Sequence, residues 1–137
     1  MLNSHPASKR AAEEEDVKLE SKSEKNELDQ DDKKYGFKFT LSDAVRVEEE
    51  FRKQGIVLDT NVVPLAELVK GMNVEREHGS HNYITNVTYN SRMMSAKIAL
   101  AHFEEDPHYY MRLEKMEKEG ENHWNRNGGV PKIFKAK

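Results

Sequence analysis

The sequence predicts an all-α protein: a compact bundle of about four short helices, with a disordered N-terminal tail and a loose C-terminal tail. Two observations carry this prediction. Apolar residues recur at three- and four-residue steps in four separate stretches between residues 37 and 124, which is the spacing of one helix face. Glycine and proline fall between these stretches, where helices begin and end.

The predicted organisation has three parts. Residues 1–36 form a charged tail, rich in Glu, Asp, Lys and Ser and poor in apolar residues. Such a segment buries too little apolar surface to offset the entropy of ordering the chain, so we expect disorder. The tail acts either as a solubilising extension or as an interaction arm. Residues 37–124 are the helical domain, and residues 125–137 are a flexible, mildly basic tail.

The first two helices have recognisable ends. Ser42 is the predicted N-cap of the first, and Gly55 ends it. The second has Pro64 in its first turn and runs to about His78, where Gly79 ends it. On the outer face of the first helix we expect a solvated stripe of three acids, Glu48, Glu49 and Glu50.

The third helix is predicted from Met93 to Phe103, with small and apolar residues and few charges. Residues 79–92 before it form a polar, irregular loop. For the fourth helix, Asp106 is the predicted N-cap and Pro107 the first helical residue. The connector between the first two helices, GIVLDTNVV, has a β-like composition.

Composition excludes several classes of function. The 137 residues contain no cysteine, which excludes disulfides, thiolate zinc sites and a cysteine nucleophile. A net charge of −3 gives the chain no electrostatic drive toward nucleic acid or anionic lipid. No stretch approaches the roughly 20 apolar residues of a membrane span, and the N-terminus lacks the apolar core of a signal peptide. We therefore expect a protein that is not secreted and has no membrane partner.

Four side chains form the candidate site for chemistry: Glu75, His78, His102 and Glu105. Within each Glu–His pair the spacing is three, which places both side chains on one helix face. Two such pairs on neighbouring antiparallel helices can present two imidazoles and two carboxylates to one point. This is a plausible ligand set for a divalent transition metal, and Glu-x-x-His elements recur in carboxylate-bridged dimetal bundles.

Two other interpretations use the same four residues. A hydrogen bond from Glu105 to His78, or from Glu75 to His102, would clamp two helices together without a metal. A bare acid–base pair in an enzyme is the third, and the metal-binding alternative includes hydrolytic activity. The adjacent Tyr109 and Tyr110 resemble stacking groups for nucleic acid, but no basic stripe accompanies them. We expect one of these tyrosines in the core and the other at its edge.

The chain also resembles one known family. The residues that carry the resemblance are GMNVEREHG at 71–79, TNVT at 85–88, KIALAH at 97–102, and then Glu105, Pro107, Tyr109, Tyr110, Leu113, Met116 and Glu117. Over about residues 39–119 they are similar to the domain of unknown function 5661 family. Among the matching positions, we expect a structural role for Gly71, Gly79, Pro107, Tyr109 and Tyr110. Phe103, Asp106 and His108 depart from the usual pattern.

The resemblance implies a compact helical fold and a viral origin, because the family occurs in tailed-phage and large-DNA-virus proteins. It implies no catalytic activity and no cofactor. Together with the composition, it favours a non-enzymatic accessory or virion-associated protein. Its expected partner is a protein, either a capsid or other virion protein or a host protein, rather than nucleic acid. The expected location is the virion or the host cytoplasm or nucleus.

Overall fold

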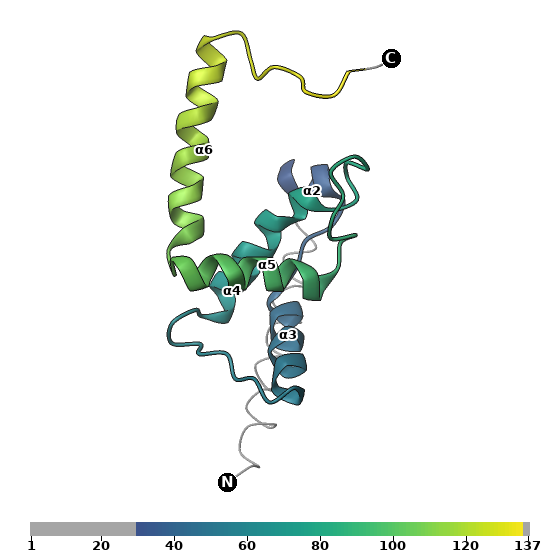
Figure 1. Cartoon of the computed structure of the whole chain (residues 1–137), viewed down its shortest axis with the longest axis vertical. Coiled ribbons are helices and arrows are strands. Elements are labelled where there is room, and N and C mark those ends of the chain that lie inside the picture. The colour runs from purple at the N-terminus through teal and green to yellow at the C-terminus, as the bar shows by residue number, and fades with distance from the viewer. Residues whose placement is uncertain (1–29, 136–137) are drawn as a thin grey trace. The chain divides into compact units, whose positions relative to one another are not determined.

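The structure is a computed structural model that describes residues 30–135. In this range the chain forms five α-helices, one 3-10 helix and no strand, as the sequence predicts for the fold class (Figure 1). The helices are α2 Gln30–Tyr35, α3 Leu41–Lys53, α4 Leu65–Val74, α5 Arg92–Glu105 and α6 Tyr109–Arg126, with the 3-10 helix η1 Glu75–His78 directly after α4. The predicted disorder of residues 1–29 lies outside the described residues.

The chain divides into two compact units between Pro107 and His108. In the first unit, α3, α4 and α5 pack pairwise, and η1 packs on both α4 and α5. Their buried apolar side chains form the core, as the helical spacing predicts, and they are Phe39, Ala44, Val45, Val47, Phe51, Leu68, Met72, Ala96, Ala99 and Phe103. The second unit contains α6 and the C-terminal segment. No helix between residues 30 and 135 is long and apolar enough to cross a membrane.

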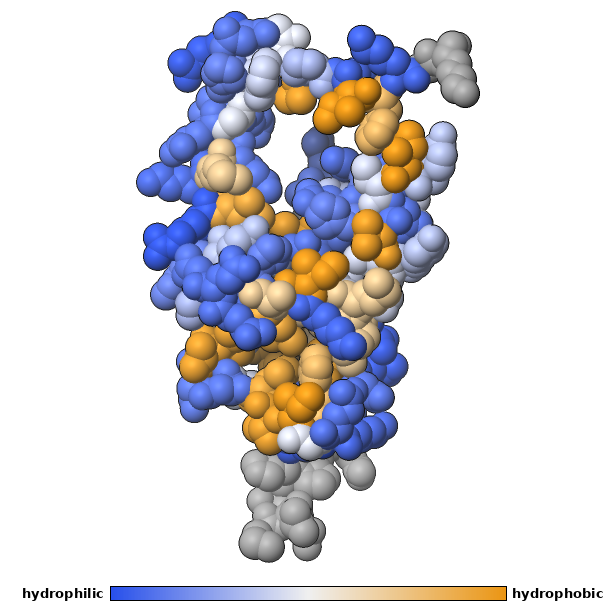
Figure 2. Space-filling model, in the orientation of Figure 1, coloured by the Kyte–Doolittle hydropathy of each residue, from blue (hydrophilic) through white to orange (hydrophobic). Residues whose placement is uncertain are grey.

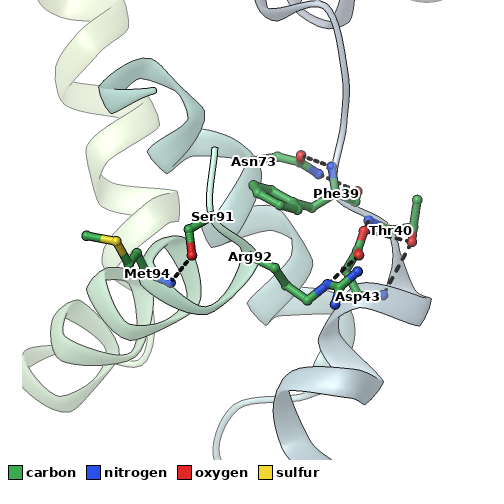
Figure 3. Close-up of polar contacts among 7 residues, drawn as sticks. All are labelled: Phe39, Thr40, Asp43, Asn73, Ser91, Arg92 and Met94. Carbon is green, nitrogen blue, oxygen red and sulfur yellow. Dashed lines mark hydrogen bonds and ion pairs between the residues drawn. The ribbon is translucent and has the colours of Figure 1, made fainter. Parts of the chain in front are cut away.

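A network of polar contacts joins the start of α3 to α4 and α5 (Figure 3). Thr40 is the N-cap of α3: its hydroxyl accepts from the backbone N–H of Asp43, and the Asp43 carboxylate accepts from the backbone N–H of Thr40 at 2.8 Å. The same carboxylate accepts from Nε of Arg92, in the first turn of α5, at 2.7 Å. The cap predicted at Ser42 is therefore wrong, because a complete capping box forms two residues earlier.

Helix α5 and the segment before α3 are fixed by two further polar contacts. The hydroxyl of Ser91 accepts from the backbone N–H of Met94, which caps α5 (Figure 3). The side-chain amide of Asn73 accepts from the backbone N–H of Phe39 at 2.7 Å and donates to its carbonyl at 2.9 Å. Asn73 thus pairs with extended backbone as a neighbouring strand would, and fixes Phe39 against α4.

Three other predicted features differ from the structure. Glu48 is buried, with one carboxylate oxygen 3.8 Å from Nη2 of Arg52, so it does not belong to the solvated stripe. Asp106 is the C-cap of α5 rather than an N-cap, since its backbone N–H donates to the carbonyl of His102. Helix α6 begins at Tyr109, with His108 as its N-cap residue.

The ordered helices also extend beyond the predicted bounds of the helical domain. Helix α2 occupies residues 30–35, which the sequence assigned to the tail, and α6 continues through Gly120 to Arg126. A glycine in an exposed helix interior costs only about 1 kcal/mol relative to alanine, so it does not end a helix by itself. The β-like connector after α3 forms turns and bends instead of a strand.

Candidate functional site

Glu75 and His78 lie in η1, the single 3-10 turn that extends α4. The Glu75 carboxylate is buried, and its Oε1 lies 3.7 Å from Nε2 of the half-exposed His78. Nε2 is closer to Glu77, at 3.1 Å from Oε1. The spacing of three therefore brings Glu75 and His78 together as predicted, although the imidazole makes its shorter contact with the exposed Glu77.

His102 and Glu105 lie in the last turn of α5, where His102 is half-buried and Glu105 is exposed. Because η1 packs on α5, the two predicted pairs belong to neighbouring segments. Among residues 30–135, however, no group of three or more His, Asp or Glu side chains could hold a metal ion. The metal hypothesis gains no support from these four positions, and the predicted helix–helix clamp stays a prediction.

The motif positions Gly71, Gly79, Tyr109 and Tyr110 lie in close contact with other parts of the fold. Gly71 is buried in α4, and its carbonyl accepts from the backbone N–H of Glu75. A Cβ on Gly79 would collide with the Asn90 side chain and come within 3.1 Å of the carbonyl of Arg76. Tyr110 is buried and Tyr109 half-buried, as predicted, and their rings meet edge to face at 5.0 Å.

Gly79 lets the chain turn closely against the loop that follows. The side-chain amide of Asn90 accepts from the backbone N–H of Ser80 at 2.9 Å and donates to its hydroxyl at 2.6 Å. The carbonyl of His78 accepts from the backbone N–H groups of Val87 and Thr88 at 2.7 and 3.0 Å. The loop over residues 79–91 is therefore fixed at both ends by hydrogen bonds.

Sequence reasoning missed the central role of Arg76. Its Nη1 lies 2.8 Å from Oδ1 of Asp32 and donates to the carbonyl of Phe37 at 2.6 Å, and its Nε donates to the carbonyl of Asn73. The guanidinium carbon lies 4.8 Å from the centre of the Tyr35 ring, in cation–π contact. This buried arginine holds α2 on η1. The sequence does contain a signal for this role, because Arg76 is a charged residue within the apolar stretch of the second predicted helix.

The most prominent apolar feature is a groove of about 560 Å³ formed by α3, the segment 56–63, α4 and α5. Its lining is mostly aliphatic and aromatic: Phe51, Ile56, Leu58, Val62, Val63, Leu65, Leu68, Leu100, Ala101 and Phe103. Figure 2 shows hydrophobic surface gathered over the segment 56–63, in the lower part of the view. Surface patches of this kind mark binding sites more often than single exposed apolar residues do.

Charged groups occur only at the edge of this groove. Asp59, Lys97 and Glu104 are exposed and complete its lining. Asp59 also shapes the segment, because its carboxylate accepts from the backbone N–H of Asn61 and its carbonyl accepts from those of Val62 and Val63. These bonds close a turn that holds Val62 over the groove with 55% of its surface exposed. Sequence reasoning missed this site, although the apolar residues of the connector 55–63 indicated it.

A second hollow, of about 720 Å³, lies between α3 and the start of α5. Its charged lining residues have mixed sign: Arg46, Lys53, Arg92, Glu49 and Glu50. Arg92 is already engaged by Asp43 in the cap of α3. Because its positive and negative charges are mixed, this hollow has no field of a single sign that would attract a charged ligand.

Comparison with known proteins and families shows the family of this chain. No curated protein and no solved structure matches the chain. A family model described as protein of unknown function (DUF5661) matches residues 10–119, a range that contains α2 to α5, the groove and the first part of α6. Because this range covers most of the 137 residues, the chain belongs to the DUF5661 family.

Proposed function

We propose that this chain is a non-catalytic protein-interaction module whose apolar groove binds a short apolar segment of a protein partner. The observation that carries the proposal is the groove itself. Its volume lies within the roughly 300–1,000 Å³ of typical ligand sites. Val62 and Ile56 leave about half of their surface open to solvent at its edge, so a bound segment would remove apolar area from water.

The lining favours a peptide segment over a polar metabolite. Small-molecule sites combine an apolar wall with a few convergent polar groups that fix the ligand's orientation. Here the charged groups lie at the edge, and two of the three, Asp59 and Glu104, are acidic. A segment with apolar side chains between basic residues complements this arrangement. Phosphate backbones would meet two carboxylates, which disfavours nucleic acid.

The biological setting belongs to the same proposal. The family resemblance, to proteins of tailed phages and large DNA viruses, supports a viral or phage-type accessory protein that is associated with the virion. The partner is then a capsid or other virion protein, or a host protein, and the location is the virion or the host cytoplasm or nucleus. Quantitative mass spectrometry of purified particles tests the virion location: stoichiometric peptides of this chain support it, and their absence from the particles overturns it in favour of the host cytoplasm or nucleus.

The binding proposal is tested by nuclear magnetic resonance on the isotope-labelled full chain. The probe is a synthetic peptide with two adjacent apolar residues between lysines, and the comparison peptide carries glutamates in place of the lysines. We expect the first to shift the amide signals of groove residues such as Val62, Leu100 and Ala101. The second should bind roughly tenfold more weakly, a loss of about 1.4 kcal/mol.

A matched pair of variants locates the binding. Val62→Lys puts a positive charge at the groove, where it repels the flanking lysines, whereas Val57→Lys makes the same change in the same segment at a residue that is 76% exposed and does not line the groove. Val62→Lys should abolish the shifts and Val57→Lys should retain them. Equal behaviour of the two variants, shifts confined to residues outside the groove, or no shifts with either peptide would each refute the proposal.

A further inference from the structure

The end of the second unit carries an exposed apolar segment. Helix α6 ends where the backbone N–H groups of Asn127 and Gly129 both donate to the carbonyl of Trp124, at 3.1 and 2.7 Å. Gly128 and Gly129 have φ angles of 83° and 89°, which residues with a side chain rarely adopt. This glycine pair stops the helix and directs the following residues out of its path.

The residues after the glycines alternate apolar and basic character: Val130, Pro131, Lys132, Ile133, Phe134 and Lys135. Val130 is 71% exposed and Ile133 is 85% exposed, and Phe134 exposes more than half of its surface. Proline fixes its own φ and restricts the residue before it, so the segment loses less conformational entropy on binding than a flexible chain does.

We propose that residues 130–135 of one copy of this chain bind in the apolar groove of a second copy, so that copies associate head to tail. The inference rests on the proposed function, since it names the occupant of the same groove. Ile133 and Phe134 supply the two adjacent apolar side chains. Lys132 and Lys135 flank them and complement Asp59 and Glu104, the two acids that outnumber the single base Lys97 among the charged lining residues of the groove.

Head-to-tail binding has a distinctive consequence. The groove and the segment are different surfaces, so the contact is heterologous: a row of bound copies keeps one free groove at one end and one free segment at the other. Association therefore continues with concentration and does not stop at a dimer unless the copies close into a ring. A dimer formed through one shared helix face would instead saturate at two copies.

The first experiment measures the mass of the full chain by sedimentation velocity over a hundredfold range of concentration. We expect the average mass to rise past that of a dimer. Val62→Lys, which blocks the groove with a positive charge, and the double variant Ile133→Ser with Phe134→Ser, which removes the apolar segment, should each remain monomeric. A matched control replaces two exposed methionines of α6, Met111→Ser with Met116→Ser, and should associate as the wild type does.

The second experiment mixes the two monomeric variants. The groove variant still has an intact C-terminal segment, and the segment variant still has an intact groove. The mixture should therefore form a complex of one copy of each and nothing larger. This rescue shows that the segment variant still folds a working groove, and the amide spectrum of the groove variant checks that its own fold is intact.

The outcomes separate the inference from the function on which it rests. If the wild-type chain stays monomeric while the lysine-flanked synthetic peptide still shifts the groove signals, the inference is wrong and the proposed function stands. If neither occurs, both are wrong. Association that the methionine control abolishes would place the contact on α6 and overturn the inference. Association that stops at a dimer would overturn the open head-to-tail arrangement.

Discussion

Arg76 and Asp32 are 44 positions apart in the chain, yet Nη1 of the arginine lies 2.8 Å from Oδ1 of the aspartate, and both side chains are buried. The arginine also donates to the carbonyls of Phe37 and Asn73. A buried guanidinium is tolerated only when its donors are paired, and here backbone and carboxylate oxygens do this. The pair therefore ties α2 to the rest of the first unit.

Removing one partner of this pair should be costly. Arg76→Ala leaves the Asp32 carboxylate without its buried cation, so we expect a loss of about 3–5 kcal/mol in the free energy of unfolding. Urea denaturation of the full chain measures it. Asp31→Asn changes an exposed acid in the same helix and should cost less than about 0.5 kcal/mol. Equal stabilities of the two variants would show that the ion pair does not hold α2.

The N-cap of α3 provides a second test. Thr40→Ala removes the hydroxyl that accepts from the Asp43 N–H and should destabilise the chain by about 1 kcal/mol. Ser42→Ala, the same kind of change at the cap predicted from the sequence, should have little effect, because Ser42 lies within the helix. Thermal unfolding of both variants distinguishes the caps. A larger loss for Ser42→Ala would contradict the observed capping box.

The sequence predicted the parts of the fold that depend on local periodicity. The buried positions of α3 and α4 follow from their helical spacing, and the end of α3 follows from Gly55, which has a φ angle of 80°. Glu48 shows the limit of this reasoning. Helical spacing predicts which face a residue occupies, whereas the burial of that face depends on what packs against it.

Long-range pairings were not predictable from the sequence. Nothing local in residues 30–35 distinguishes them from a charged tail; their order depends on Arg76, which lies more than 40 positions later. The groove depends in the same way on α3, α4 and α5 meeting around one segment. For the candidate metal ligands, spacing predicted correctly that Glu75 and His78 meet, but it gave no information on the direction of His102 and Glu105.

Gly79 should tolerate no side chain in the present arrangement. Gly79→Ala would push the Asn90 amide away from Ser80 and break the two hydrogen bonds between these residues, so we expect a loss of about 1–3 kcal/mol. Asn90→Gly alone loses the same hydrogen bonds. The double variant should therefore cost less than the sum of the single changes. Strict additivity in urea denaturation would show that the Asn90 side chain is not the obstacle.

Asn73 should contribute to stability through both ends of its amide. Because its side chain accepts from the Phe39 N–H and donates to the Phe39 carbonyl, Asn73→Ala leaves two part-buried backbone groups unpaired. Each unpaired buried group costs about 1–3 kcal/mol, and water reaching the part-buried site reduces this, so we expect a total near the lower end of that range. Hydrogen exchange gives a sharper test, since the Phe39 amide should lose its protection in this variant. Asn125→Ala, at an exposed position of α6, is the control and should leave that protection unchanged. If the Phe39 amide exchanges equally slowly in both variants, its protection comes from burial alone and the paired amide is not what fixes this segment on α4.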